Sequence, residues 1–125
     1  MKRETLANYY NSLAWYNLLT GKFKASEAIL RKGIKLDSSN LYFYTNLPPV
    51  LLLQGKYEQA LELYKELRNK DFTPSSDYET FADVFLSDFE EFKKEGIIPK
   101  ERQGDVDKII GLLKMESVKK DISGK

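Results

Sequence analysis

A hexapeptide pattern occurs twice in this sequence, as LLTGKF at residues 18–23 and as LLQGKY at residues 52–57. The two glycines, Gly21 and Gly55, are 34 residues apart. A fixed period of about 20 to 50 residues is typical of repeat proteins, in which each unit is one supersecondary element that cannot bury its apolar face alone. The pattern therefore predicts stacked units and a function carried by the surface that stacking creates.

Apolar residues follow the helical period of 3.6 through most of the chain. We expect helices over about residues 4–20, 23–36, 41–54 and 57–69, joined in pairs by the two glycine turns, with Asn40 in the turn before the third helix as its N-cap. The residues expected to face inward are Leu6, Tyr10, Leu13, Ala14 and Asn17 in the first helix, Ala25, Ile29, Leu30, Gly33 and Ile34 in the second, Tyr44, Leu47 and Leu51 in the third, and Ala60, Leu61, Tyr64 and Leu67 in the fourth.

A third, looser helical pair follows. Ser76 and Glu79 have the spacing of a capping box, which predicts a fifth helix that reaches about Glu95 and ends at Gly96. A short final helix begins as early as Pro99. The fifth helix has an apolar stripe that we expect to be buried, formed by Tyr78, Phe81, Phe85, Phe89 and Phe92. We expect the opposite face to be solvated, and its acidic residues are Asp77, Glu79, Asp83, Asp88, Glu90, Glu91 and Glu95. The apolar face of the last helix consists of Val106, Ile109, Ile110 and Leu113.

The first two helical pairs resemble the tetratricopeptide repeat (TPR) family, whose pattern is W-x2-L-G-x2-Y followed by A-x3-F and a late proline. This resemblance implies an all-α, TPR-like α-solenoid of three antiparallel helical hairpins, with residues 1–125 as one domain. Its parts would be repeat 1 at about residues 6–39, repeat 2 at about 40–73, a degenerate or capping hairpin at about 75–115, and a polar tail at 116–125. The pattern falls on Tyr10, Leu13, Ala14, Asn17, Ser26, Leu30 and Ser38, and again on Tyr44, Leu47, Pro48, Leu51, Ala60 and Tyr64.

The main departure from the family pattern is the pair Pro48-Pro49 inside the third helix. A proline in a helix interior costs on the order of 3 kcal/mol and removes one backbone hydrogen bond. Two interpretations follow: a kinked helix that keeps the repeat register, or a break after which the helix restarts at Pro48. In both, the carbonyls of Tyr44 and Thr45 lose their usual partners.

In TPR proteins the first helix of each pair lines a concave groove in which peptides bind, so the resemblance implies a peptide-binding face here. Asparagine can hold an extended backbone, and aromatic side chains supply contact area at low entropic cost. For Trp15 and Tyr42, packing within the core is an equally good interpretation. The groove candidates are Asn8, Asn11, Trp15, Tyr42, Thr45, Asn46, Pro49, Asp83, Ser87 and Glu90.

The charges in this groove predict the kind of partner. The clamp of Lys, Asn and Arg with which some TPR proteins grip a terminal carboxylate is matched only at Asn46, so chaperone C-termini are not the expected ligand. Asp83 and Glu90 favour a neutral to basic protein or peptide segment. The second helix is basic and the fifth acidic, which leaves open a homo-oligomer or a structural terminal unit of a larger assembly as the alternative function.

Composition narrows the function further. Twenty basic and nineteen acidic residues give a net charge of +1, which argues against nucleic acid as a partner. The chain has no Cys and no His, so the commonest metal ligands and the commonest general base are missing. We therefore expect no enzyme activity, no cofactor and no metal. Polar residues interrupt the apolar residues of the first helix, so we expect neither a signal peptide nor membrane binding, and a cytoplasmic location.

Overall fold

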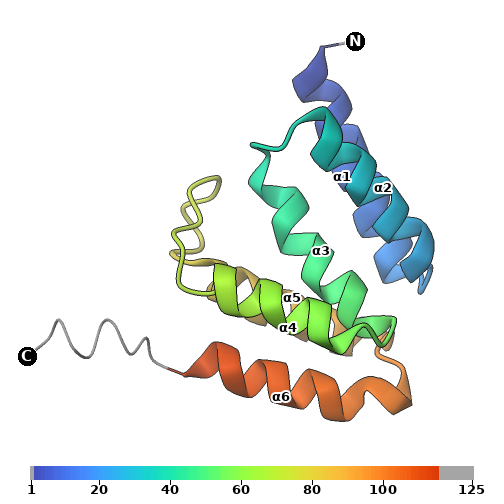
Figure 1. The fold of residues 1–125 in the computed structure, drawn as a ribbon, viewed down its shortest axis with the longest axis vertical. Coiled ribbons are helices and arrows are strands. Elements are labelled where there is room, and N and C mark those ends of the chain that lie inside the picture. Colours follow the sequence, from blue (N-terminus) through green and yellow to red (C-terminus); the bar gives the residue numbers. More distant parts are fainter. Residues whose placement is uncertain (1, 116–125) are drawn as a thin grey trace, which may run out of the picture.

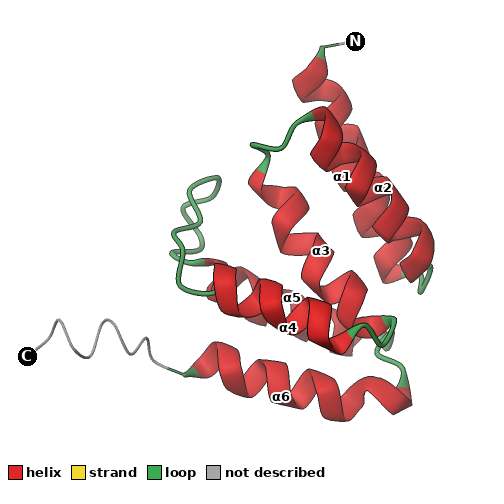
Figure 2. Cartoon of the chain, in the orientation of Figure 1, coloured by secondary structure: helices red, strands yellow, loops and turns green. Residues whose placement is uncertain are grey.

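A computed structural model describes residues 2–115 of the chain, and in this part the protein is all-helical (Figures 1 and 2). The described residues contain six α-helices and no β-strand, which confirms the predicted fold class. The predicted polar tail at residues 116–125 lies outside the described residues. The helices are α1 (Arg3–Leu19), α2 (Phe23–Leu36), α3 (Leu41–Leu53), α4 (Tyr57–Leu67), α5 (Phe81–Glu95) and α6 (Gln103–Lys114), and a 3-10 turn at Lys100–Arg102 precedes α6.

The same turn geometry closes all three helical hairpins. Gly21, Gly55 and Gly96 have φ angles of 79°, 92° and 66°, in the left-handed region that a side chain would strain. Each glycine N–H donates to the carbonyl three residues earlier, and the following N–H donates to the carbonyl five residues earlier. This pair of bonds is the Schellman motif. The repeated glycines, Gly21 and Gly55, thus end their helices as the sequence predicts, and α5 ends in the same way at Gly96.

The hairpins pack side by side in chain order, an arrangement consistent with an α-solenoid. Helix α2 packs on α1 and α3, while α5 and α6 pack on α4, as Figure 1 shows. Helix α3 is the centre of the core, because every residue from 45 to 53 is buried. Gly33 permits the close approach of α2 to α3, since a β-carbon at this position would overlap the ring of Phe43. The asparagine expected to cap α3, Asn40, accepts a hydrogen bond from the N–H of Tyr42 at 3.0 Å.

Helix α3 continues through Pro48 and Pro49 as one element. The predicted alternative of a break with a restart at Pro48 is therefore not observed. Both prolines are buried in the core, so packing on all sides offsets the loss of two backbone donors. The third hairpin also keeps its predicted core, because Phe81, Phe85, Phe89 and Phe92 are all buried, as are Val106, Ile109 and Leu113 of α6.

The predicted start of α5 is wrong. The capping box consists of Thr80 and Asp83 rather than Ser76 and Glu79, and α5 begins at Phe81. The reason is a tertiary contact: Asp71 and Thr80 form an antiparallel bridge, and the N–H of Phe81 donates to the carbonyl of Lys70 at 3.0 Å. Residues 68–80 consequently form a long loop between α4 and α5 (Figure 2).

The predicted inward face of α2 is wrong at one position. Ala25 is exposed, whereas its neighbour Ser26 is fully buried. The hydroxyl of Ser26 donates to the carbonyl of Ala14 at 2.7 Å and so fastens α2 to α1. The other two buried residues of α2, Leu30 and Gly33, belong to the predicted face, so the error is confined to its first turn.

Candidate functional site

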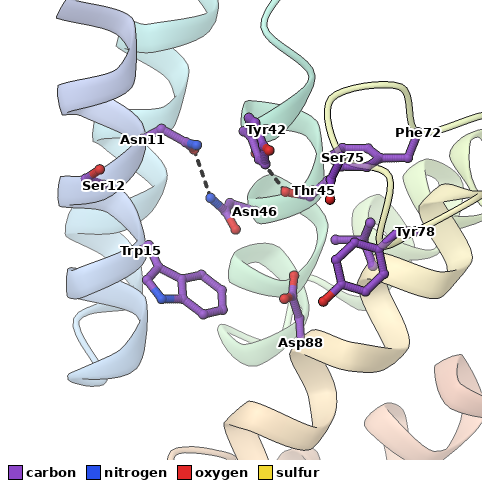
Figure 3. Close-up of a pocket in the computed structure, with 11 residues that line it drawn as sticks. Asn11, Ser12, Trp15, Tyr42, Thr45, Asn46, Phe72, Ser75, Tyr78 and Asp88 are labelled. Carbon is purple, nitrogen blue, oxygen red and sulfur yellow. Dashed lines mark hydrogen bonds between the residues drawn. The ribbon is translucent and has the colours of Figure 1, made fainter. Parts of the chain in front are cut away.

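A cavity of about 350 Å³ lies between α1, α3, the loop at residues 68–80 and α5 (Figure 3). This size falls within the range of small-molecule and side-chain pockets, roughly 300 to 1,000 Å³. The lining comes from the first helix of each hairpin and from the loop that precedes α5. The lining residues are Asn11, Ser12, Trp15, Tyr42, Thr45, Asn46, Phe72, Ser75, Tyr78, Val84 and Asp88.

Aromatic rings form two walls of the cavity. On the α1 side, Trp15 is half-buried and its ring centroid is 5.7 Å from that of Phe92 on α5. On the loop side, the ring of Tyr42 meets that of Phe72 edge to face at 5.4 Å. Such tilted and edge-on pairs hold rings in fixed orientations. The tryptophan is thus anchored to the core by one edge and still contributes to the cavity, which combines the two interpretations that the sequence left open.

Polar groups line the floor of the cavity. The side-chain amide of Asn46 donates to the side-chain oxygen of Asn11 at 2.9 Å, which joins α3 to α1. The hydroxyl of Thr45 donates to the carbonyl of Tyr42 at 2.9 Å. A side-chain amide offers two N–H donors and one acceptor oxygen, so the amide pair retains donor and acceptor capacity after its mutual bond forms. Hydrogen-bonding groups of these three side chains therefore lie at the cavity.

Asp88 carries the only charged side chain among the described residues that line the cavity. It is half-buried, and no described residue donates a hydrogen bond to it or forms an ion pair with it. Burial, and secondarily the charge of Glu91, raise the pKa of Asp88 to about 7. Burial, and secondarily the charge of Asp88, raise the pKa of Tyr64, whose fully buried hydroxyl makes no hydrogen bond to a described residue. The carboxylate of Asp88 therefore faces the cavity without a hydrogen-bond or ion-pair partner among residues 2–115.

A second carboxylate, Glu27 of α2, has the opposite surroundings. Its oxygens accept hydrogen bonds from Arg31 Nε at 2.8 Å, Gln54 Nε2 at 2.8 Å and Lys56 Nζ at 2.9 Å. Burial alone would raise the pKa of Glu27, but these three donors outweigh it and lower the pKa to about 2. The Glu27 cluster, defined as Glu27 with these three partners, fastens α2 to the turn between α3 and α4. It is a structural ion pair rather than a binding site.

Five of the ten groove residues predicted from the sequence line the cavity: Asn11, Trp15, Tyr42, Thr45 and Asn46. The other five lie elsewhere. Asn8 is exposed one turn before Asn11 and Pro49 is buried, whereas Glu90 is exposed and lies 3.7 Å from the ammonium of Lys93.

The remaining two residues stabilise the region around the cavity. The carboxylate of Asp83 accepts the N–H of Thr80 in the capping box at 3.1 Å. The hydroxyl of Ser87 lies 3.0 Å from that of Tyr78 and so holds the loop against α5. These two side chains therefore position the cavity wall, but they do not line it.

The sequence interpretation placed two lining residues incorrectly. Asp88 was expected on the solvated face of the fifth helix, and Tyr78 in its buried stripe. The structure places Tyr78 in the loop, and Asp88 on the cavity. A signal for Asp88 exists in the sequence, because it follows Phe85 by three residues and precedes Phe92 by four. Phe72 and Ser75 gave no such signal, since they reach the cavity only through the fold of the loop.

Comparison of the chain with protein-family models, with curated proteins and with solved structures finds no match. Among residues 2–115 no group of His, Cys, Asp or Glu is placed to hold a metal ion. No helix in this part combines the length and the apolar composition that crossing a bilayer requires.

Proposed function

We propose that this protein is a non-enzymatic interaction module that binds a segment of a partner protein in the cavity between α1, α3 and α5. The observation that carries the proposal is the composition of the lining, in which an amide pair, Asn11 with Asn46, is flanked by the aromatic rings of Trp15 and Tyr42. Side-chain amides can form hydrogen bonds with the backbone of an extended peptide, and aromatic side chains supply apolar contact area at a low cost in conformational entropy. The TPR-like arrangement expected from the sequence, with a groove lined by the first helix of each hairpin, agrees with this position.

Selection of peptides from a random library displayed on phage tests the proposal. Trp15 is the only tryptophan in the chain, so the change in its fluorescence gives the affinity of each selected peptide in solution. We expect Asn11→Ala to weaken binding about tenfold, because a hydrogen-bonding group in the cavity is lost. The matched control is Asn8→Ala, one turn earlier on the same helix and outside the cavity, which should change affinity less than twofold.

Two results would contradict the proposal. The first is a library that yields no peptide with saturable binding. The second is equal weakening by Asn8→Ala and Asn11→Ala, because a surface effect of α1 would then explain the loss. Since both substitutions remove an asparagine from one helix, their difference isolates the cavity from helix stability.

A second candidate function, a structural or oligomerising unit, is favoured by two exposed tyrosines on α1. Tyr9 and Tyr16 are 57% and 61% exposed and lie seven residues apart, so they share one face of the helix. Light scattering over a hundredfold range of concentration distinguishes the two functions. A mass that stays at 14.5 kDa supports the interaction module, whereas a dimer that Tyr16→Ser dissociates supports the oligomerising unit.

A further inference from the structure

The position of Asp88 defines the ligand more closely than the rest of the cavity does. In Figure 3 its carboxylate lies between the ring of Trp15 and the ring of Tyr78 and points toward Asn46. The eleven lining residues include no cation, and the ion pairs among the described residues do not involve Asp88. The described lining thus combines a single negative charge with an aromatic ring on each side of it in this view (Figure 3).

This combination matches the chemistry of a cation. A carboxylate shielded from water is unfavourable unless a donor or an opposite charge compensates it, and no described residue does so here. Aromatic faces attract cations through their quadrupoles, most strongly in sites with little water. A metal ion is a poor fit, because Asp88 is the one carboxylate of the described lining and no group of three His, Cys, Asp or Glu side chains lies among the described residues.

We propose that the cavity binds one basic side chain, lysine or arginine, of the partner segment, with its cation on Asp88 and its aliphatic stem between Trp15 and Tyr78. This inference rests on the proposed function, since the basic side chain belongs to the bound segment. The neighbouring Asn11 and Asn46 would bind the backbone of that segment, so the basic residue is a fixed anchor rather than one of several scattered charges. Long basic side chains suit the site, because their stems pack on rings while the charged end reaches the carboxylate.

The carboxylate that we propose for binding the basic side chain, Asp88, differs from the carboxylates that the sequence predicted for this role. Asp83 and Glu90 were expected to attract a basic ligand, but Asp83 is bound within its capping box and Glu90 has a side chain that is 76% exposed. A solvent-exposed carboxylate attracts a basic ligand weakly and does not select where in the ligand sequence the basic residue lies. A shielded carboxylate in a cavity selects a cation at one position.

The test begins with the same phage selection on the wild-type protein. We expect the selected peptides to share a lysine or arginine at one fixed position. The best peptide is then synthesised with its neutral analogue at that position, norleucine for lysine or citrulline for arginine. Both peptides are titrated against the wild type, against Asp88→Asn, and against Glu90→Gln as the matched control, which removes one carboxylate from the same helix outside the cavity.

The expected result is a loss of at least tenfold in affinity when either the cation or the Asp88 charge is removed, and little further loss when both are removed. Glu90→Gln should stay within twofold of the wild type. The peptide analogue requires no change in the protein, so the test remains decisive if a variant folds poorly. Urea unfolding of each variant verifies its fold.

Three outcomes would overturn the inference while the proposed function stands: selected peptides without a basic residue at a fixed position, equal losses in Asp88→Asn and Glu90→Gln, and a neutral analogue that binds as tightly as the basic peptide. Binding of N-acetyl-lysine amide as tight as that of the whole peptide would overturn the assignment to a partner segment and make the site one for a small free cation. Failure to select any peptide overturns the proposed function itself and this inference with it.

Discussion

Glu27 on α2 and Asp88 on α5 are both shielded carboxylates, but the fold treats them in opposite ways. Glu27 accepts hydrogen bonds from Arg31, Gln54 and Lys56, and its pKa falls to about 2. Asp88 accepts none from the described residues, and its pKa rises to about 7. The first carboxylate closes a contact between two hairpins. The second lies at an open cavity.

The two carboxylates differ in how their ionised forms affect the stability of the fold. A carboxylate with three donors stabilises the fold over most of the pH range, whereas one without donors destabilises it whenever it is ionised. Stability alone accounts for Glu27. It does not account for Asp88, whereas the cation of the proposed ligand would. Four substitutions test this contrast.

The largest effect is expected at the cavity wall. Trp15→Ala should lower the free energy of unfolding by about 2 kcal/mol, less than the roughly 3 to 5 kcal/mol of a fully buried aromatic residue, because Trp15 is half-buried. It should also abolish measurable binding of the selected peptide. Urea midpoints and peptide titrations detected by a fluorescent label measure the two effects. Tyr16→Ala, at the adjacent exposed position, is the control and should change stability by about 0.5 kcal/mol or less. A loss of stability with unchanged binding would remove Trp15 from the binding site.

The next effect is expected at the Glu27 cluster. Glu27→Gln should lower the free energy of unfolding by about 1.5 kcal/mol at pH 7, because charge-assisted hydrogen bonds are lost while the exposed cations regain water. The folded pKa of about 2 lies below the ordinary value of 4.5, so this stabilisation is complete above about pH 4.5 and disappears as the pH falls toward 2. Urea unfolding of both proteins between pH 2 and pH 7 should therefore converge at the acidic end. Equal stability at pH 7 would show that the cluster contributes nothing.

Asp88→Asn should act in the opposite direction and more weakly. We expect it to raise the free energy of unfolding at pH 8 by about 1 kcal/mol, because an uncompensated charge is removed. The folded pKa of about 7 lies above the ordinary value of 3.8, so the wild type loses stability as the pH rises from about 4 through 7, and the variant should lack this slope. A variant that is less stable than the wild type at pH 8 would indicate an internal partner for Asp88.

The smallest effect is expected at Tyr64. Its fully buried hydroxyl makes no hydrogen bond to a described residue, so Tyr64→Phe should change the free energy of unfolding by no more than about 0.5 kcal/mol. The packing of the ring against Phe85, at a centroid distance of 4.7 Å, is retained in the variant. A loss above 1 kcal/mol in urea unfolding would instead show that the hydroxyl is satisfied in the folded protein.

Periodicity and turn chemistry sufficed to predict the fold class. Gly21 and Gly55 end their helices as expected, and the phenylalanines of α5 are buried as their spacing requires. These features depend on neighbours within a few residues in the chain. The residues predicted from the TPR resemblance include every lining residue on α1 and α3 except Ser12.

The remaining half of the cavity depends on contacts that a local pattern does not contain. The bridge between Asp71 and Thr80 delays the start of α5, places Tyr78 in a loop and brings Phe72 to the cavity. Asp88 was assigned to solvent because an acidic residue among other acidic residues is usually exposed. Its spacing from Phe85 and Phe92 indicated a partly buried position instead. Only the packing of the neighbouring elements decides between exposure and burial.

The three glycine turns have a consequence for protein engineering. Each one ends the preceding helix with two backbone hydrogen bonds and one left-handed glycine. Because the hydrogen bonds of this motif lie in the backbone, the same turn can be written into another helix end with a single glycine. Extra hairpins that end in the same glycine turn could therefore be inserted between the existing ones, and the array of packed helices would lengthen.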